Sequence, residues 1–166
     1  KKIYFPRLII PLYKAVAGLV DFVVALFILV ILFWYYGFTP SMNIIYFPLF
    51  ILLMVLSSLT VGIWFSALTI RYRDFQYVVP FLVQFGLYIT PIVYPSSILV
   101  NNLPSWATFA FFLNPIASVV DGFRWCLLGV SAPGGYFWVS FSVIFILFIS
   151  GLFYFKKLEK VMADII

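Results

Sequence analysis

The chain has 166 residues, of which 66% are hydrophobic and only 9% are charged, and its net charge is +5. A soluble domain carries about 25% charged residues, so this composition excludes an ordinary water-soluble globular fold. With no histidine and a single cysteine, the chain lacks the commonest metal ligand, the commonest general base near neutral pH and the means to close a disulfide within itself.

Residues 1–14 combine basic, aromatic and aliphatic side chains and are interrupted by Pro6 and Pro11. This mixture is typical of a segment in the headgroup region of a membrane, where rings are buried and amines reach water. We therefore expect a cytoplasmic interfacial segment here. Because the chain begins with Lys1 and no signal-peptide pattern precedes the first apolar run, we expect it to be the C-terminal part of a longer protein.

Runs of roughly 18 or more apolar residues indicate helices that cross a bilayer. The predicted spans are residues 15–36, 44–70, 76–94 and 136–155, followed by a cytoplasmic tail at 156–166. The first run ends in the aromatic cluster Trp34-Tyr35-Tyr36, which is typical of a bilayer interface. Pro80 either kinks the third span or marks its start. Residues 96–105 are predicted to be a polar loop.

Residues 106–130 are long and apolar enough to cross the bilayer once. However, Asn114-Pro115 interrupts the run, and its second half contains the charged residues Asp121 and Arg124. We predict two short helices, 106–113 and 116–128, that form a re-entrant hairpin in one leaflet. Irregular backbone at membrane depth is tolerated only where protein or a watery cavity covers it. The hairpin should therefore face a pore or a partner. Its candidate functional residues are Trp106, Asn114, Pro115, Asp121, Arg124 and Trp125.

Asp121 and Arg124 are spaced i, i+3 and can pair on one face of a helix. We favour this mutual ion pair over the alternative that Arg124 faces an anionic substrate. Asp21, inside the first apolar run, belongs either to a substrate or gating site or, as we favour, to an interfacial pair with a basic neighbour.

The positions of the basic residues indicate the orientation. If the first residues are cytoplasmic, that side holds Lys1, Lys2, Arg7, Lys14, Arg71, Arg73, Lys156, Lys157 and Lys160, and the outer side holds only Arg124. This distribution obeys the positive-inside rule. A full crossing by residues 106–130 would place the tail outside, so the charges independently favour the hairpin. Basic span ends suit anionic membrane surfaces, and no nucleic-acid partner is expected.

The charged turn Arg71-Tyr72-Arg73-Asp74 separates the second and third spans. Arg71, Arg73 and Asp74 form either a positive anchor in which Asp74 caps the next helix, or a contact with a cytoplasmic partner. The residues leave both interpretations open.

Aromatic residues make up 22% of the chain, and Trp64, Phe65, Phe81, Phe85 and Tyr88 fall within predicted spans. A pore lined by rings would suit sugars, because the C–H faces of sugars pack on aromatic rings. For any single ring, packing between helices or against lipid is the simpler interpretation. Trp64, Phe85 and Tyr88 are the candidate pore aromatics.

The sequence contains no Gly-Lys-Ser/Thr phosphate loop, no paired carboxylates and no Ser/His/Asp set. We therefore expect no catalysis, no metal and no cofactor in this chain.

Six motifs follow one another along nearly the whole sequence. They are Lys2-Ile3-Tyr4-Phe5-Pro6-Arg7, Gly18-Leu19-Val20-Asp21-Phe22, Arg71-Tyr72-Arg73-Asp74-Phe75, Thr90-Pro91-Ile92-Val93-Tyr94-Pro95, Leu113-Asn114-Pro115 and Gly122-Phe123-Arg124-Trp125. In this order they resemble the permeases of type-2 ATP-binding-cassette exporters, above all those that export O-antigen, capsular polysaccharide or teichoic acid.

This resemblance implies an all-α permease of six spans in the bacterial inner membrane, of which this chain holds the last four spans and the re-entrant hairpin. It implies that Tyr4, Phe5, Pro6 and Arg7 belong to the coupling region that touches a separate ATPase subunit, which binds ATP and magnesium. Two permease copies would then form the path of a lipid-linked glycan.

Three other hypotheses remain. The chain could belong to a drug or lipid efflux permease of the same superfamily, because dense aromatics also suit hydrophobic cargo. It could be a membrane-embedded enzyme that modifies glycans or lipids, although the lack of histidine and of clustered acids argues against this. It could also be a scaffold subunit that transports nothing.

Overall fold

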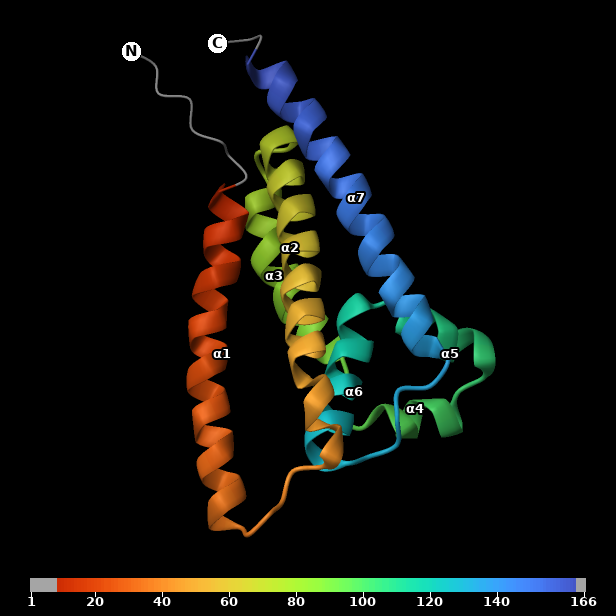
Figure 1. Ribbon diagram of the computed structural model, residues 1–166. Coiled ribbons are helices and arrows are strands. Elements are labelled where there is room, and N and C mark those ends of the chain that lie inside the picture. Colours follow the sequence, from red (N-terminus) through yellow and green to blue (C-terminus); the bar gives the residue numbers. More distant parts are fainter. Residues whose placement is uncertain (1–8, 164–166) are drawn as a thin grey trace.

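The computed structural model describes residues 9–163, and every regular element within them is a helix. In chain order the elements are α1 (Ile9–Tyr35), the 3-10 helix η1 (Met42–Tyr46), α2 (Phe47–Arg71), α3 (Phe75–Ile89), α4 (Ser96–Asn102), α5 (Ser105–Phe112), α6 (Pro115–Leu128) and α7 (Tyr136–Ala163). Figure 1 shows the long helices side by side, with the short ones gathered near one end. The predicted all-α membrane bundle is confirmed.

Among the described residues, three stretches are long and apolar enough to cross a bilayer: Ala15–Tyr35, Met42–Arg71 and Tyr136–Leu158. They coincide closely with the spans predicted at 15–36, 44–70 and 136–155. The helix α7 runs on to Ala163, so most of the predicted cytoplasmic tail continues the last span as helix.

The helix α3 is shorter than the span predicted at 76–94. Its 15 residues cover about 22 Å at roughly 1.5 Å per residue, whereas the hydrocarbon core measures about 30 Å. The helix ends because Thr90 precedes Pro91, and a residue before proline is driven out of the helical conformation. Pro80 lies inside α3, where it has no N–H to offer the carbonyl of Gln76.

The prediction of a loop at residues 96–105 was wrong for its first part, which forms α4. Pro95 precedes this helix in an extended conformation, and the N–H of Leu103 closes the last turn on the carbonyl of Leu99 at 2.9 Å. The polar residues Asn101-Asn102 and Pro104 favour a loop, whereas residues 96–102 form about two helical turns.

The core lies where α6 packs against both α2 and α7. Its buried residues are Phe50 and Leu53 from α2, Val119 and Cys126 from α6, and Ile144 from α7. Gly122 allows this close approach, because a Cβ at that position would overlap the ring of Phe50. A second cluster, Ile63, Ala67 and Phe155, joins α2 to α7 farther along.

Several hydroxyl side chains of α2 are satisfied by their own helix. Ser57 and Thr60 donate to the carbonyls of Leu53 and Leu56, each at 2.7 Å. Hydrocarbon offers no water to bond such groups, and bonding to the carbonyl four residues earlier removes the need for a partner helix.

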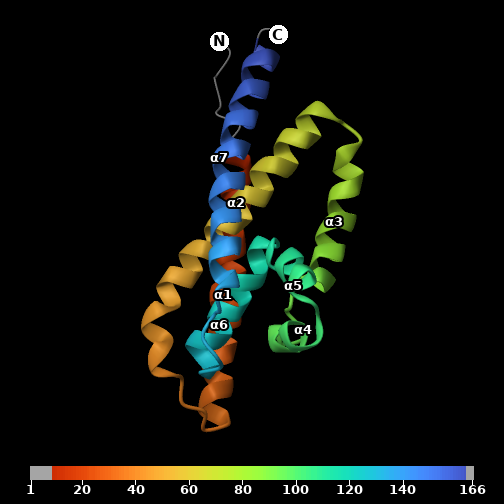
Figure 2. The ribbon, with the colours of Figure 1, turned by 90° about the vertical axis from the view of Figure 1, so that its right-hand side faces the viewer.

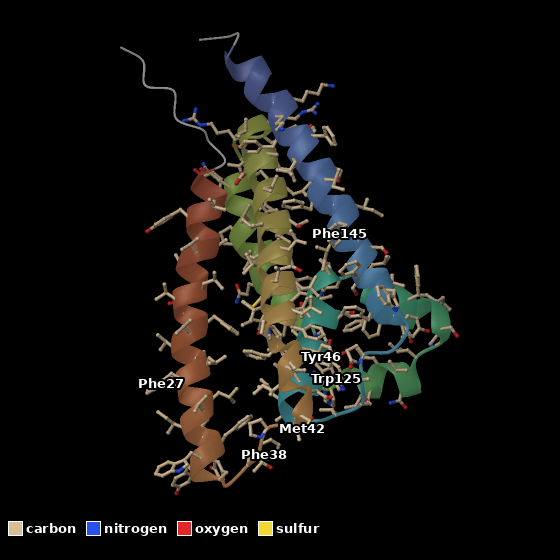
Figure 3. All side chains as sticks on the ribbon, in the orientation of Figure 1. Phe27, Phe38, Met42, Tyr46, Trp125 and Phe145 are labelled. Carbon is tan, nitrogen blue, oxygen red and sulfur yellow. The ribbon has the colours of Figure 1, made fainter. Side chains whose placement is uncertain are left out.

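The helix α1 is the least covered span. None of the residues in its most apolar window is buried, and Phe27 points away from α2 in Figure 3. In a bilayer, this surface would contact lipid or other protein.

The two ends of the bundle differ in charge. The start of α1, the α2–α3 turn and the last turns of α7 lie at one end in both views, and α4 and the connection to α7 lie toward the other (Figures 1 and 2). Among the described residues, Arg71, Arg73, Lys156 and Lys157 belong to the first end, whereas Arg124 lies near the second.

The predicted break in residues 106–128 is present between α5 and α6. The two helices are bent by 91° at Leu113 and Asn114, so they form a right-angled corner rather than a tight antiparallel pair. From this corner α6 descends toward the same end of the bundle as α4 (Figure 2).

Candidate functional site

The coupling candidates Tyr4, Phe5, Pro6 and Arg7 lie outside the described residues. Asp21 is exposed and makes no ion pair with any described side chain. No cluster of His, Cys, Asp and Glu within residues 9–163 has the make-up of a metal site.

The turn between α2 and α3 presents Arg71, Arg73 and Asp74. Arg71 donates from Nη1 to the hydroxyl of Tyr154 at 3.0 Å and thereby joins the turn to α7. Arg73 and Asp74 are exposed. Asp74 precedes α3 in a helical conformation and makes no side-chain cap hydrogen bond. The capping role suggested for it is absent, and among the described side chains neither Arg73 nor Asp74 has an ion-pair partner.

Trp64 packs between α2 and α7. Its indole stacks on Tyr154 with centroids 5.6 Å apart, and its Nε1 donates to the carbonyl of Leu147 at 2.9 Å. A Cβ on Gly151 would approach this nitrogen to 2.9 Å, so the glycine makes room for the ring. Trp64 therefore connects α2 to α7, and its ring is already packed against Tyr154. Phe65 likewise packs edge-on against Phe75.

The other candidate pore aromatics share one face of α3 with residues that the sequence analysis did not select. Positions 77, 81, 84, 85 and 88 fall within one arc of a helix with 3.6 residues per turn. They hold Tyr77, Phe81, Gln84, Phe85 and Tyr88. The four rings are 54–76% exposed, and Phe81 stacks on Phe85 at 5.9 Å. The i, i+4 and i+7 spacing was the signal that could have added Tyr77 and Gln84.

This face is turned away from the helix on which α3 packs. Phe75, on the opposite side of α3, contacts Phe65 of α2, and Figure 2 shows α3 diverging from α2 beyond their turn. An uncovered row of rings with an amide among them suits a ligand that has both apolar and hydroxyl surfaces.

Asn114 and Pro115 form the corner between α5 and α6. Pro115 holds Asn114 in an extended conformation, and the Asn114 side-chain oxygen caps α6 by accepting from the N–H of Ile116 at 3.1 Å. The Asn114 amide donates to the hydroxyl of Thr90 at 2.9 Å. The corner is thereby bonded to the end of α3.

Two serines that the sequence analysis did not single out hold the corner against α7. Ser118 donates to the hydroxyl of Ser140 at 2.8 Å, and Ser140 donates to the carbonyl of Phe112 at 2.6 Å. Both side chains are buried. Nothing in the sequence distinguishes these two serines from the other serines of the apolar runs. Their hydrogen bonds join different helices, and the sequence does not show which helices become neighbours.

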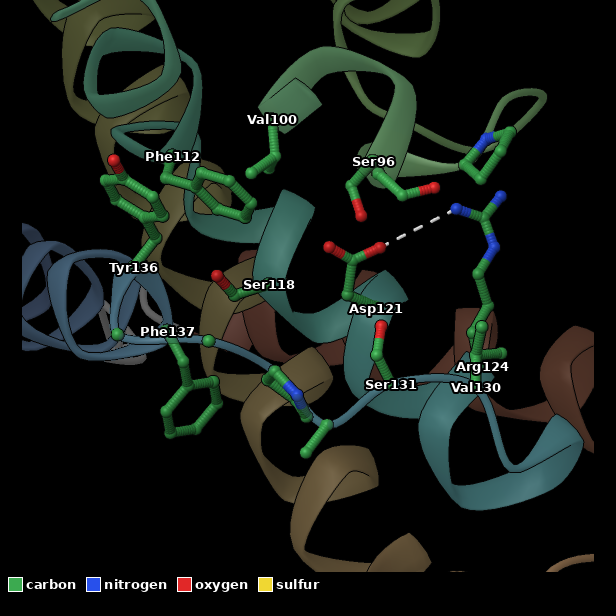
Figure 4. Close-up of a pocket in the computed structure, with 16 residues that line it drawn as sticks. Ser96, Val100, Phe112, Ser118, Asp121, Arg124, Val130, Ser131, Tyr136 and Phe137 are labelled. Atoms are coloured by element: carbon green, nitrogen blue, oxygen red, sulfur yellow. Dashed lines mark ion pairs between the residues drawn. The ribbon is translucent and has the colours of Figure 1, made fainter. Parts of the chain in front are cut away.

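Arg124 fastens α6 to the connection between α3 and α4. Its guanidinium donates to the carbonyls of Tyr94 at 3.0 Å and Ile92 at 2.9 Å. It also lies 3.6 Å from the Asp121 carboxylate, with side-chain exposures of 24% for Arg124 and 16% for Asp121 (Figure 4). The i, i+3 pair is present as expected. The two carbonyl bonds favour a structural role for Arg124 over direct contact with an anionic substrate.

The two tryptophans of this region differ in their surroundings. Trp106 is exposed on α5. Trp125 stacks on Tyr46 of η1 with centroids 5.2 Å apart, and Figure 3 shows the two residues next to each other. Trp125 therefore holds α6 against the start of α2.

Comparison with known proteins connects this geometry to a family. Residues 3–128 match the ABC-2 type transporter family. The chain is 29% identical over 167 aligned positions to two O-antigen export system permease proteins RfbA of Klebsiella pneumoniae, and the match covers 100% of this chain and 63% of each relative. A protein of the same name from Myxococcus xanthus is 27% identical over 123 residues, or 74% of this chain and 46% of the relative.

The family match takes in α1, α2, α3 and the whole corner formed by α5 and α6. The features described above, namely the charged turn, the aromatic face and the Asn114 corner, therefore all lie within it. This chain belongs to the ABC-2 type transporter family.

Proposed function

We propose that this chain is part of the permease subunit of an ATP-driven exporter that moves a polysaccharide or lipid-linked glycan across the bacterial inner membrane. The relatives that it matches over its full length are named O-antigen export permeases. The proposed partners are a separate ATPase that binds ATP and magnesium, contacted through Tyr4–Arg7, and a second permease copy.

The structural observation that carries this proposal is the aromatic face of α3, composed of Tyr77, Phe81, Gln84, Phe85 and Tyr88. The face is exposed in the single chain, and its rings and amide offer stacking surfaces and hydrogen bonds to passing sugars. If two copies turned these faces toward each other, the rings would line a shared path. ATP binding would then shift the population of closed and open states.

Removing two rings of this face should impair export without unfolding the protein. For Phe85→Ala/Tyr88→Ala in the full-length permease, we expect export to fall about tenfold, since an aromatic contact contributes roughly 0.5–1.5 kcal/mol and about 1.4 kcal/mol changes a rate tenfold. The measurement is the amount of surface polysaccharide in a strain that lacks the gene and carries each variant with the ATPase.

The matched control is Val83→Ala, an exposed position of α3 outside the aromatic face. It should export at the wild-type rate. If the double variant and Val83→Ala lost the same amount of surface polysaccharide, the proposed role of the aromatic face in export would be contradicted. Normal polysaccharide with lost drug resistance would favour the efflux alternative, and normal polysaccharide in the deletion strain would refute glycan export altogether.

The proposal places residues 96–135 and the corner on the outer side of the membrane. Cys126 is buried, so replacing it by alanine gives a background for introduced cysteines. We expect Asn102→Cys and Ala132→Cys to react with a membrane-impermeant thiol reagent from outside, and Arg73→Cys to react only after the membrane is opened. Labelling of positions 102 and 132 from opposite sides would mean that residues 106–128 cross the bilayer.

A further inference from the structure

A cavity of about 480 Å³ lies among α4, α6 and the connection that leads into α7. It lies away from the basic end of the bundle, on the side that the proposed orientation places outside. Its volume falls within the roughly 300–1,000 Å³ typical of small-molecule sites. The cavity is therefore large enough for a sugar or a short saccharide.

One wall of the cavity is polar and rich in hydrogen-bond acceptors. Ser96, Ser118, Asp121 and Ser131 line it, and Figure 4 shows the carboxylate of Asp121 at its centre. The 3.6 Å separation of Asp121 from Arg124 exceeds the roughly 2.7–2.9 Å of a hydrogen-bonded charge pair. Ser96 hydrogen-bonds to the Asp121 carboxylate, and because a carboxylate has about four acceptor sites, it can still accept hydrogen bonds from a ligand.

Among the described residues that line the cavity, Arg124 is the only cation, and both of its terminal nitrogens already donate to backbone carbonyls. Nη1 of Arg124 donates to the carbonyl of Tyr94 and Nη2 donates to the carbonyl of Ile92. The nearby carboxylate of Asp121 offsets the charge of the guanidinium. Because the charges of Asp121 and Arg124 offset each other, the lining offers an anionic ligand no net positive charge. A neutral ligand that donates several hydrogen bonds fits better.

The opposite wall is aromatic. Phe112 and Tyr136 stack with centroids 5.2 Å apart and ring planes only 5° from parallel, and Figure 4 shows Val100 of α4 close to Phe112. A pyranose ring has the same two-sided character, with C–H groups that pack on aromatic faces and hydroxyls that donate to carboxylates.

From this complementarity we propose that the cavity is a binding site for a neutral sugar unit, with Asp121 as the principal acceptor of its hydroxyl protons. The assignment rests on the proposed glycan export for its biological meaning. On the outer side, the site would hold a sugar of the emerging chain.

The test is saturation-transfer NMR on the full-length permease with its ATPase, in lipid nanodiscs prepared without glycoside detergents. The probes are D-glucose, D-galactose, D-mannose and D-glucuronate. We expect at least one neutral hexose to receive saturation from the wild type, and glucuronate to receive less. Asp121→Asn should weaken hexose binding roughly tenfold, the lower end of the effect of a hydrogen bond to a charged group.

Val100→Trp should obstruct the cavity and abolish the hexose signal. Ile98→Trp is its matched control, because Ile98 lies on α4 and does not line the cavity, and it should keep the signal. A hexose signal that survives Val100→Trp, a stronger signal from glucuronate, or no wild-type hexose signal would overturn the assignment.

The outcomes for this site and for the proposed export are separable. Absence of hexose binding together with normal polysaccharide export would reject the cavity alone. Hexose binding together with normal surface polysaccharide in the deletion strain would reject the export function and leave the sugar site in place.

Discussion

Gly122→Ala is expected to destabilise the full-length permease by about 2 kcal/mol. The added methyl would overlap the ring of Phe50, which is already packed among Phe123, Trp125 and Phe137. Overpacking a core of this kind costs about 1–3 kcal/mol, and here the upper value applies because the contact is a ring with no free space behind it. The higher helix propensity of alanine returns only about 1 kcal/mol.

The measurement is unfolding in mixed micelles with increasing dodecyl sulfate, followed by tryptophan fluorescence. Gly18→Ala is the control, since a Cβ there meets no described atom outside the neighbouring backbone of its own helix within 4 Å, and it should leave the midpoint unchanged or raise it. Adding Phe50→Leu to Gly122→Ala should restore part of the lost stability. If the two substitutions simply add, the contact does not limit the packing of α6.

Arg124→Met should destabilise the end of the bundle that holds α4 by about 3 kcal/mol and abolish the proposed export. The substitution leaves Asp121 without its cation and removes the donors to the carbonyls of Ile92 and Tyr94. Breaking a buried ion pair by removing one partner costs about 3–5 kcal/mol, and the lower value applies because both side chains retain some exposure.

Thermal aggregation of the purified permease and the polysaccharide assay measure this effect. Arg124→Lys should have a stability between those of the wild type and Arg124→Met. An ammonium keeps the charge, but it lacks the planar guanidinium that reaches three acceptors at once. Asp121→Asn/Arg124→Met should be more stable than Arg124→Met alone, since it removes the uncompensated carboxylate. Equal stability of the single and double variants would mean that the ion pair contributes little.

The long helices were predictable because hydrocarbon imposes a simple rule on them. A run such as residues 15–36 must be helical and of bilayer length, and α1 and α2 follow this closely. The Asn114-Pro115 corner was predictable for a related reason, since the residue before a proline leaves the helical conformation. The same signal at Thr90-Pro91 ends α3 at Ile89, whereas the predicted span continues past it to Tyr94 and is therefore too long.

The partners of individual side chains could not be predicted in the same way. Trp64 and Phe85 look alike as aromatics inside apolar runs, yet Trp64 is bonded to α7 and Phe85 lies on an open face. The difference depends on which helices become neighbours, and periodicity contains no such information. Ser140 illustrates the same limit, because its role depends on Ser118 and Phe112 from two other helices.

The shortness of α3 has a consequence for the surrounding lipid. A helix of 15 residues leaves several ångströms of hydrophobic mismatch against a core of about 30 Å. Acyl chains next to α3 must compress, or headgroups and water must move inward, and either adjustment thins the membrane there. The bilayer would therefore be thinner beside α3 than beside the longer helices α1, α2 and α7.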